Sequence, residues 1–463
     1  MSRYMISVVL TAMTLSGCAS YQPIPLTDKA VAKRLSEPNM RDVRIKAGQI
    51  EHSILKPIEF DDRDGLSPDE VAILAVLVNP RLQAIRDSRA IANAQLFQAG
   101  LLPNPQLSYN MDFPTGGNTD GRVNAFGLGL DWDVGSLITH QQKIDAAKTH
   151  TDSVNLEIAW QEWQVAEAAK LHVYRLVIAR KRLALAKQIK DERENDLTAI
   201  TNAVEMGERK SLDLSASSNA MEQSKLTLLE AYDKERQEQF ALNRVIGLSS
   251  EKVIPLQQGI NIPSCANTPS VAKAADGIEN CRLDLLALKA GYQSQEAKVM
   301  AAVKSQFPRI NIGLSNGRDT DNIKTVGFGV TIELPFFNQN QGRIAIERAT
   351  RQQLFDEYTL RLFDAQSKIA AVLSSLQYTR DRIGTIKASI PTLNQMLHSY
   401  EAAVKTGNAD ILSYYHILDD LYKKKFELLK LEDRQAQLSI AFEIATGKYL
   451  PNSNRTVKKE IAK

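Results

Sequence analysis

The sequence has few of the residues that mark nucleic-acid-binding, disulfide-rich or catalytic proteins. It contains three cysteines and six histidines in 463 residues, and aromatic residues make up only 6%. Its formal net charge is +3, and no basic patch with interleaved aromatics occurs, so nucleic acid is not an expected partner. No HExxH, P-loop, nucleophile-elbow or CxxC motif is present. The sequence therefore predicts no enzyme, no cofactor and no metal site.

Long apolar runs are missing after residue 17, where no stretch of about eighteen apolar residues could form a spanning helix. Residues 1–17 themselves read as an export signal, because Arg3 precedes a short apolar run that ends in Ser16-Gly17. The following Cys18 is typical of a bacterial lipoprotein, in which this cysteine is lipidated. The alternative is an ordinary signal peptide with a cysteine there by chance. Ala19 and Ser20, without an aspartate, favour sorting to the outer membrane.

The other two cysteines, Cys265 and Cys281, lie in or beside a proline-rich stretch, 251–280, for which irregular structure is expected. An exported protein folds in an oxidising compartment, so the two form either a disulfide or two free thiols. Residues 18–65 have little periodicity and are expected to be an extended anchor segment. The tail, 451–463, is expected to be disordered.

The chain contains one unit twice, at 66–250 and 281–450. Asn124–Val134 reads NAFGLGLDWDV and Lys324–Leu334 reads KTVGFGVTIEL, about 200 residues later. Gly207 and Leu212 recur as Gly407 and Leu412 with the same offset. Each unit predicts a helix (Ser67–Leu101 in the first), a β-hairpin and a long helical hairpin.

Two hairpins, about 106–134 and 309–334, alternate between apolar and polar residues, as strands with two different faces do. The apolar face carries Phe126, Trp132 and Phe328, which are expected to contact lipid. The opposite face carries glycines with Asp131, Asp133 and Glu333, which are expected to face a lumen. One such strand alone would favour a soluble sandwich, whereas four in an exported chain favour a membrane barrel. Four strands cannot close a barrel, so other copies must complete it.

The helical segments 136–206 and 338–406 each reach roughly 105 Å at 1.5 Å per residue. Such lengths, with apolar seams at heptad spacing, predict coiled coils whose tips lie at Gly207 and Gly407. Pro391 is expected to kink or locally break the second of these helices.

These features together resemble the outer-membrane factor family, the TolC-like efflux channels. Gln98–Pro105 (QAGLLPNP) resembles the family's first helix-to-strand junction, and Leu334–Gly342 (LPFFNQNQG) resembles its CzcC-type cation-efflux branch. The resemblance implies an α+β membrane protein: a homotrimer with a twelve-stranded outer-membrane β-barrel, four strands per protomer, continuous with a periplasmic α-helical barrel. It also implies a periplasmic membrane-fusion adaptor, an inner-membrane pump of RND type, and outer-membrane lipid as partners.

By the same resemblance, the residues at the tips are candidates for adaptor docking: Gly207, Leu212, Gly407 and Leu412. The alternative is that they only form structural turns. Relatives narrow the tip with acidic rings at places that hold Ser413 and His416 here, which puts such a ring in doubt. The candidate gate residues are Asp410, Ser413, His416, Asp419 and Asp420.

The predicted function is therefore an outer-membrane duct that receives substrate from the pump and adaptor. Heavy-metal cations are the first choice of substrate, on the Leu334–Gly342 motif. The alternatives are drugs or other organic solutes, and type I secretion. A lipid-anchored periplasmic coiled-coil scaffold is the rival from another class, although it would not explain the four strands.

Overall fold

The computed structural model describes residues 20–263, 269–406 and 408–448. Several predictions fall outside this range: the signal peptide, lipidation at Cys18, the role of Gly407, the tail, and the Cys265 half of the disulfide. The chain divides into two compact units, 1–39 and 40–463.

Within residues 20–39, the described part of the first unit, the chain forms the short helix α2 (Asp28–Arg34). The Thr27 hydroxyl accepts a hydrogen bond from the Ala30 amide and caps its first turn. Asp28 in the first turn and Arg34 in the last complement the helix dipole. The expectation of a fully extended segment was therefore wrong here. It was also wrong at α3 (Met40–Gly48) in the second unit, which buries Val43 and Ala47 one turn apart.

The helix predicted over Ser67–Leu101 is broken into α4 (Pro68–Val78) and α5 (Pro80–Gly100). Pro80 has no amide hydrogen to donate, and the extended backbone of Asn79 turns the chain between the helices. The Asn79 Oδ1 accepts hydrogen bonds from the first amides of α5, and its Nδ2 donates to the Val245 carbonyl at 2.6 Å. The break therefore fastens α5 to the end of the helix that contains Val245.

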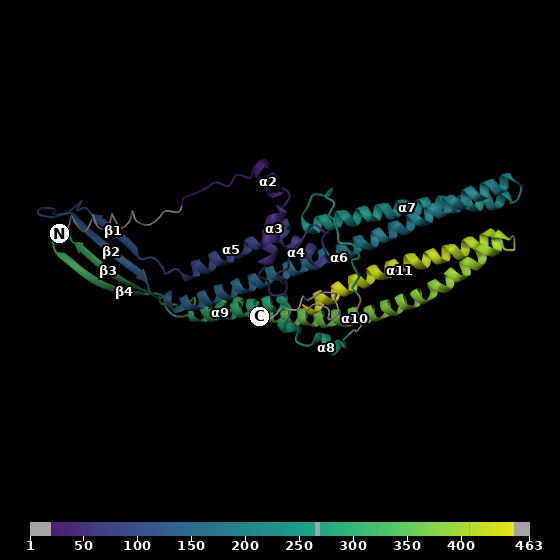
Figure 1. The fold of residues 1–463 in the computed structure, drawn as a ribbon. Coiled ribbons are helices and arrows are strands. Elements are labelled where there is room, and N and C mark those ends of the chain that lie inside the picture. The colour runs from purple at the N-terminus through teal and green to yellow at the C-terminus, as the bar shows by residue number, and fades with distance from the viewer. Residues whose placement is uncertain (1–19, 264–268, 407, 449–463) are drawn as a thin grey trace, which may run out of the picture. The chain divides into compact units, whose positions relative to one another are not determined.

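Four antiparallel strands form one sheet in the order β1-β2-β3-β4 (Figure 1). They are β1 (Gln106–Asp112), β2 (Ala125–Asp133), β3 (Ile310–Arg318) and β4 (Lys324–Ile332). Each pair lies within one of the two predicted hairpin ranges, and β2 joins the two hairpins by pairing with β3. The register places Asp131 opposite Gly313 and Trp132 opposite Ile312.

The helical part repeats the same order of elements. The first copy of the repeat has α6 (Leu137–Glu205) followed by α7 (Ser211–Ile246). The second copy has α10 (Gln341–Lys405) followed by α11 (Ile411–Thr446). Helices α7 and α11 both contain 36 residues, and both end at a left-handed glycine, Gly247 and Gly447. A Cβ atom at Gly247 would clash with the Pro80 ring, so this end also needs glycine for space. The two copies of the unit thus have matching helix ends.

Pro391 lies inside α10, which continues through it to Lys405. The predicted local break was therefore wrong, and the alternative, a kink at Pro391, stays a prediction. A proline removes only one backbone hydrogen bond from a helix, and α10 is held against α11 beside it. The residues that pack there are Ile383, Ile386, Ile390, Leu428 and Leu431.

The main core lies where α4 packs against α6 and α7, and Trp163 at its centre is fully buried. A second core joins α10 and α11 to the short α8 (Val271–Ala275) and the 3-10 turn η1 (Ile278–Asn280). Apart from those two elements, the described part of 251–280 is irregular, as expected. Helix α9 (Leu283–Lys304) lies between α6 and α10. Within the described residues, none of the helices has the length and apolarity needed to cross a membrane.

Candidate functional site

The sheet has one apolar face. Cross-strand register puts Leu107, Leu130, Leu314 and Phe328 in one row on that face, and all four side chains are exposed. The neighbouring row contains Trp132, Ile312 and Val330. Trp132 is half-buried because its indole N–H donates to the Pro103 carbonyl at 2.8 Å. Phe126 is half-buried beneath the Arg318 guanidinium, 5.4 Å from its ring centroid. A continuous exposed apolar face of this kind needs a nonpolar partner.

The opposite face is polar and flat. Side chains of β1, β2 and β3 lie over glycines of the neighbouring strand: Ser108 beside Gly129, Asp131 beside Gly313, and Ser315 beside Gly327. A Cβ atom at Gly313 would come within 2.5 Å of the Asp131 carboxylate, so only glycine leaves that space. Asp131 is exposed, whereas Asp133 is half-buried and accepts a hydrogen bond from the Ser136 amide. Glu333 lies 3.7 Å from Arg309 in an exposed ion pair. The face therefore offers carboxylates and hydroxyls to water.

The elements of the second unit have a definite lateral order (Figure 1). Helix α6 packs against α5 and α7 on one side and against α9 and α11 on the other, and α10 packs against α9 and α11. We call β1, α5 and α7 the first edge, and β4 and α10 the second edge. Strands β1 and β4 each have a neighbour in the sheet on one side only. Both edges thus end in elements without a partner on their outer side within the described chain.

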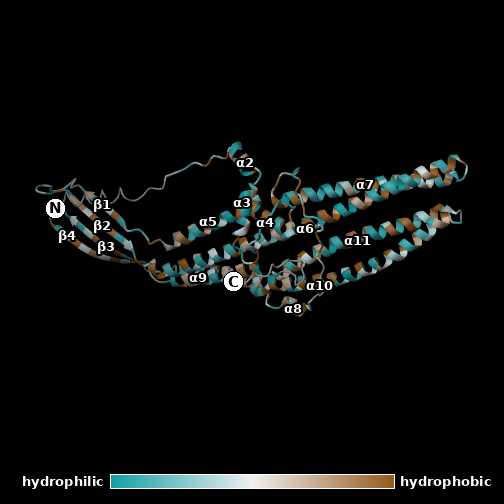
Figure 2. Ribbon diagram, in the orientation of Figure 1, coloured by the Kyte–Doolittle hydropathy of each residue, from teal (hydrophilic) through white to brown (hydrophobic). Residues whose placement is uncertain are grey.

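Apolar and polar residues alternate along the long helices (Figure 2), and both edges have exposed large apolar side chains. On the first edge they are Ile91, Phe97, Leu226, Leu229, Tyr232 and Phe240. On the second edge they are Ile346, Phe355, Leu360, Phe363, Tyr378 and Met396. By contrast, the 69-residue α6 exposes only Leu137 and Ile138, at its start. The helical edges therefore have the composition of interfaces, and the middle of the unit does not.

The first helix tip turns at Gly207, whose φ of 76° lies in the left-handed region. Leu212, just after the turn, is 63% exposed, and Leu412 at the other tip is 42% exposed. Two apolar side chains with this exposure, next to tight turns, are available to a partner. The predicted docking role of these residues stays a prediction.

Among the candidate gate residues, Asp410 has a structural role. Its carboxylate accepts hydrogen bonds from the amide and the hydroxyl of Ser413 and so caps α11. These hydrogen bonds lower the pKa of the Asp410 carboxyl below its usual value. His416 is exposed, and Asp420 lies 3.8 Å from Lys423 in an exposed pair. Asp410 therefore stabilises the start of its own helix, and Asp419 is the next candidate gate residue to consider.

Asp419 joins the two helical hairpins. Its Oδ1 accepts a hydrogen bond from the Arg193 Nη2 of α6 at 2.6 Å, and Arg193 is only 2% exposed. The guanidinium also lies 4.4 Å from the ring centroid of Tyr415, whose hydroxyl donates to Ser217 of α7. We call Arg193, Tyr415 and Asp419 the hairpin latch. Sequence reasoning missed Arg193, because nothing local distinguishes it and its partner is 226 residues away.

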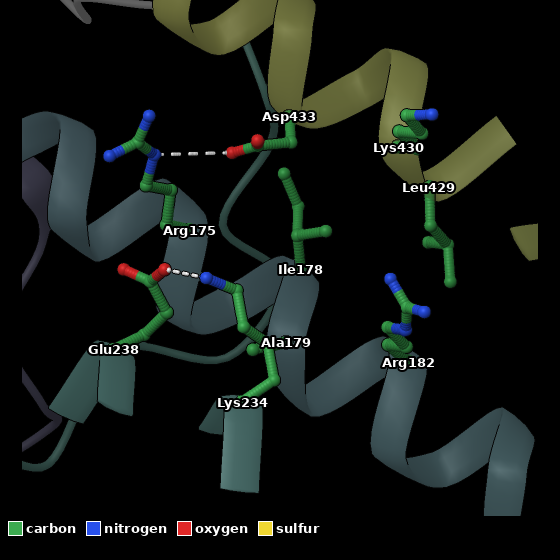
Figure 3. Close-up of a pocket in the computed structure, with 9 residues that line it drawn as sticks. All are labelled: Arg175, Ile178, Ala179, Arg182, Lys234, Glu238, Leu429, Lys430 and Asp433. Atoms are coloured by element: carbon green, nitrogen blue, oxygen red, sulfur yellow. Dashed lines mark hydrogen bonds and ion pairs between the residues drawn. The ribbon is translucent and has the colours of Figure 1, made fainter. Parts of the chain in front are cut away.

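A small cavity of about 230 Å³ lies further along the same junction, among α6, α7 and α11 (Figure 3). Arg175 faces Asp433 across it at 3.4 Å, and Lys234 pairs with Glu238 at 2.7 Å. Arg182 and Lys430 also line it, so cations outnumber carboxylates. Such a lining does not suit a metal ion. Throughout the described part of the chain, no three His, Cys, Asp or Glu side chains are placed to hold one. Cys281 is half-buried and forms no disulfide with any described residue, and its predicted disulfide with Cys265 stays a prediction.

Comparison with known proteins defines the class. Residues 277–448 match the family model described as outer membrane efflux protein. The predicted resemblance is thereby confirmed, and so is the predicted fold of one protomer, with four strands in one sheet joined to long helices. The predicted outer-membrane location agrees with the description of the matching family. The trimer, the closed twelve-stranded barrel and the lipid anchor stay predictions.

The particular relatives agree with this class. The chain is 22% identical over 379 residues to the cobalt-zinc-cadmium resistance protein CzcC of Cupriavidus metallidurans, which covers 81% of this chain and 88% of that protein. Among solved structures, CusC matches with a TM-score of 0.71 at 17% identity, over 84% of this chain and 93% of that one. The outer membrane channel CmeC of Campylobacter jejuni matches with a TM-score of 0.70 at 14% identity, over 95% and 96%. At these identities, the structural matches establish the fold.

Proposed function

We propose that this protein is the outer-membrane duct of a tripartite efflux system, formed by three copies of the chain. The observation that carries the proposal is the pair of unpartnered edges. An edge strand with free backbone groups cannot stand open in lipid, so β4 of one copy must pair with β1 of the next. A ring of three copies would contain twelve strands in a closed β-barrel, with the apolar sheet face outside and the polar face lining a water-filled passage.

The helical edges support the same arrangement. Pairing β4 with β1 brings the second edge of one copy next to the first edge of another, which is a head-to-tail contact that repeats around a ring. The exposed aromatic and aliphatic side chains of α10 would then be covered by those of α5 and α7. Burial of such side chains contributes roughly 25 cal/mol per Å² of apolar surface. One set of contacts thus closes both the barrel and the helical tunnel.

The latch gives the proposed gate a physical basis. Arg193 and Asp419 tie α6 of the first hairpin to α11 of the second at the tip half of the helices. Removing Asp419 would leave the buried Arg193 guanidinium without its ion-pair partner, which is costly, so the latch favours the closed arrangement of the hairpins. A periplasmic adaptor that docks on the tips, at Leu212 and Leu412, would open the duct by separating them. An inner-membrane pump, of RND type, would supply the energy.

Heavy-metal cations are the proposed substrate. Two observations support them: similarity to a cobalt-zinc-cadmium resistance protein, and the carboxylates Asp131 and Asp133 on the proposed lumen face. The motif Leu334–Gly342 points to the same branch. Organic solutes are the alternative, which growth of a deletion strain on a panel of metals and drugs would distinguish. Sensitivity to drugs alone would refute the metal assignment.

The duct itself is tested by reconstituting the purified full-length chain in planar lipid bilayers. Discrete channel currents are expected, and Arg193→Gln should raise the mean conductance several-fold because it removes the latch. The matched control is Arg180→Gln, since Arg180 pairs with Glu235 within the first hairpin and not between hairpins. Absence of any channel would refute the duct. Equal conductance of Arg193→Gln and the control would refute the latch alone.

A further inference from the structure

One nitrogen of the Arg193 guanidinium, Nη1, lacks a hydrogen-bond partner among the described residues. The Nη2 of the same guanidinium donates a hydrogen bond to Asp419, whereas Nη1 is buried. A buried donor without a partner is costly, at about 1–3 kcal/mol. The latch as it stands is therefore not fully satisfied, and any carboxylate that approached Nη1 would gain from doing so.

Asp196 is such a carboxylate. It lies three residues after Arg193 on α6, and side chains at this spacing share one helix face. Its Oδ2 is buried and likewise has no hydrogen-bond partner in the described chain. An unsatisfied acceptor and an unsatisfied donor thus lie on neighbouring turns of one helix, next to the same interface with α11.

The surroundings of Asp196 raise the pKa of its carboxyl and so favour its protonated form. Burial raises the pKa of the Asp196 carboxyl, Arg193 acts in the opposite direction, and the acids Glu192 of α6 and Glu401 of α10 raise it further. From α11, Tyr414 and Tyr415 face it, and both stay neutral because burial raises the pKa of each hydroxyl, that of Tyr414 to about 12. Ser217 of α7 is uncharged and accepts the hydrogen bond of the Tyr415 hydroxyl.

We propose that Asp196 is a positioning residue of the hairpin latch, which when ionised draws the Arg193 guanidinium toward α6 and when protonated leaves it to Asp419 alone. The inference rests on the proposed function, because the latch matters only if the hairpins gate a duct. A raised pKa means that the Asp196 carboxyl begins to be protonated above the usual range of an aspartate. Mild acid therefore strengthens the link between the hairpins and closes the duct.

The test is single-channel recording of the full-length protein at pH 7.5 and pH 5. The mean open current of the unaltered protein should fall several-fold on acidification, beyond the change in the conductivity of the solution. Asp196→Asn, which resembles the protonated state, should give a low current that is the same at both pH values. The matched control is Asp191→Asn on the same helix, an exposed acid that should keep the full pH response.

The outcomes separate the two proposals. If no channels form at all, the proposed function fails. If channels form but Asp196→Asn keeps the pH response, the response belongs to another group, such as His398 or His416, and the role of Asp196 is refuted. A pH-independent current in the unaltered protein, or a current that rises in acid, would also refute it. Folding of each variant is checked by its elution volume in size-exclusion chromatography.

Discussion

Helices α6 and α10 occupy the same place in the two copies of the unit, yet their surroundings differ. Helix α6 is covered on both sides, and its buried residues run from Thr139 to Ile200. Helix α10 is covered on one side, and it exposes aromatic side chains at Phe355, Phe363 and Tyr378. The difference comes from position in the lateral order, because both helices are long and have apolar seams. A duplicated unit thus makes one helix a core element and the other an interface.

The largest effect is expected when two exposed phenylalanines of α10 are replaced by glutamate. Phe355→Glu combined with Phe363→Glu should abolish trimer formation, because burying two unpaired carboxylates between subunits costs several kcal/mol each. Light scattering of the detergent-solubilised protein measures the mass of the complex. The control is Gln353→Glu, which adds a charge at an exposed polar position of the same helix. A trimer that survives the double substitution would show that α10 is not an interface helix.

The next largest effect is expected from truncating one aromatic side chain on each helix, because the buried one stabilises the protomer and the exposed one stabilises the trimer. Trp163→Ala on α6 should cost about 3–5 kcal/mol, as truncating a fully buried tryptophan does. Tyr378→Ala on α10 should weaken association instead, so raising the protein concentration tenfold should recover much of the lost stability. Urea unfolding at two protein concentrations distinguishes the two. The comparison would fail if Tyr378→Ala showed no dependence on concentration.

A pH effect is expected at Glu238 in the first hairpin, and the positions of the second hairpin that correspond to Glu238 and His172 hold no titratable side chain. Glu238 of α7 accepts hydrogen bonds from His172 and Lys234, which lower its pKa from the usual 4.5 to about 2. Its ionised form therefore stabilises the fold above pH 4.5, and this contribution is lost as the pH falls from 4.5 toward 2. The positions 200 residues on hold buried Leu438 and Val372, which do not titrate.

The corresponding measurement is thermal unfolding of Glu238→Gln against pH. The variant should unfold a few degrees lower than the unaltered protein at pH 7, roughly the shift that 1 kcal/mol gives, and the difference should vanish near pH 2. Leu438→Ala, as the comparison in the second hairpin, should lower stability equally across that range. A Glu238→Gln deficit that stays constant down to pH 2 would contradict the assigned role.

The smallest effects concern the turn of the first hairpin and the proline found only in the second. Gly207→Ala should cost about 1 kcal/mol, because an alanine is strained at a positive φ. Pro391→Ala should change stability little or raise it slightly, since α10 already runs through this position and regains a backbone hydrogen bond. Chemical denaturation measures both. A large loss on replacing Pro391 would mean that the proline itself shapes α10.

Much of this fold could be predicted from the sequence, because the decisive patterns are local. Alternation located the strands and their faces, and Gly207 marked the first tip. The break at Asn79 was missed although Asn before Pro is a known helix start. The latch and the edges could not be predicted, because the Arg193–Asp419 pair and the position of α10 depend on how distant segments pack. Periodicity identifies an apolar seam but not which partner covers it.

Cross-linking of the two sheet edges tests the closed ring most directly. Cysteines are introduced in pairs along β1 and β4, for example at Tyr109 and Phe328, in a background that lacks the native Cys265 and Cys281. Oxidised protein is then separated on a denaturing gel. The account predicts a covalent ladder that ends at three copies, for the pairs in register only. A ladder that stops at two copies, or monomers for every pair, would contradict the trimeric duct.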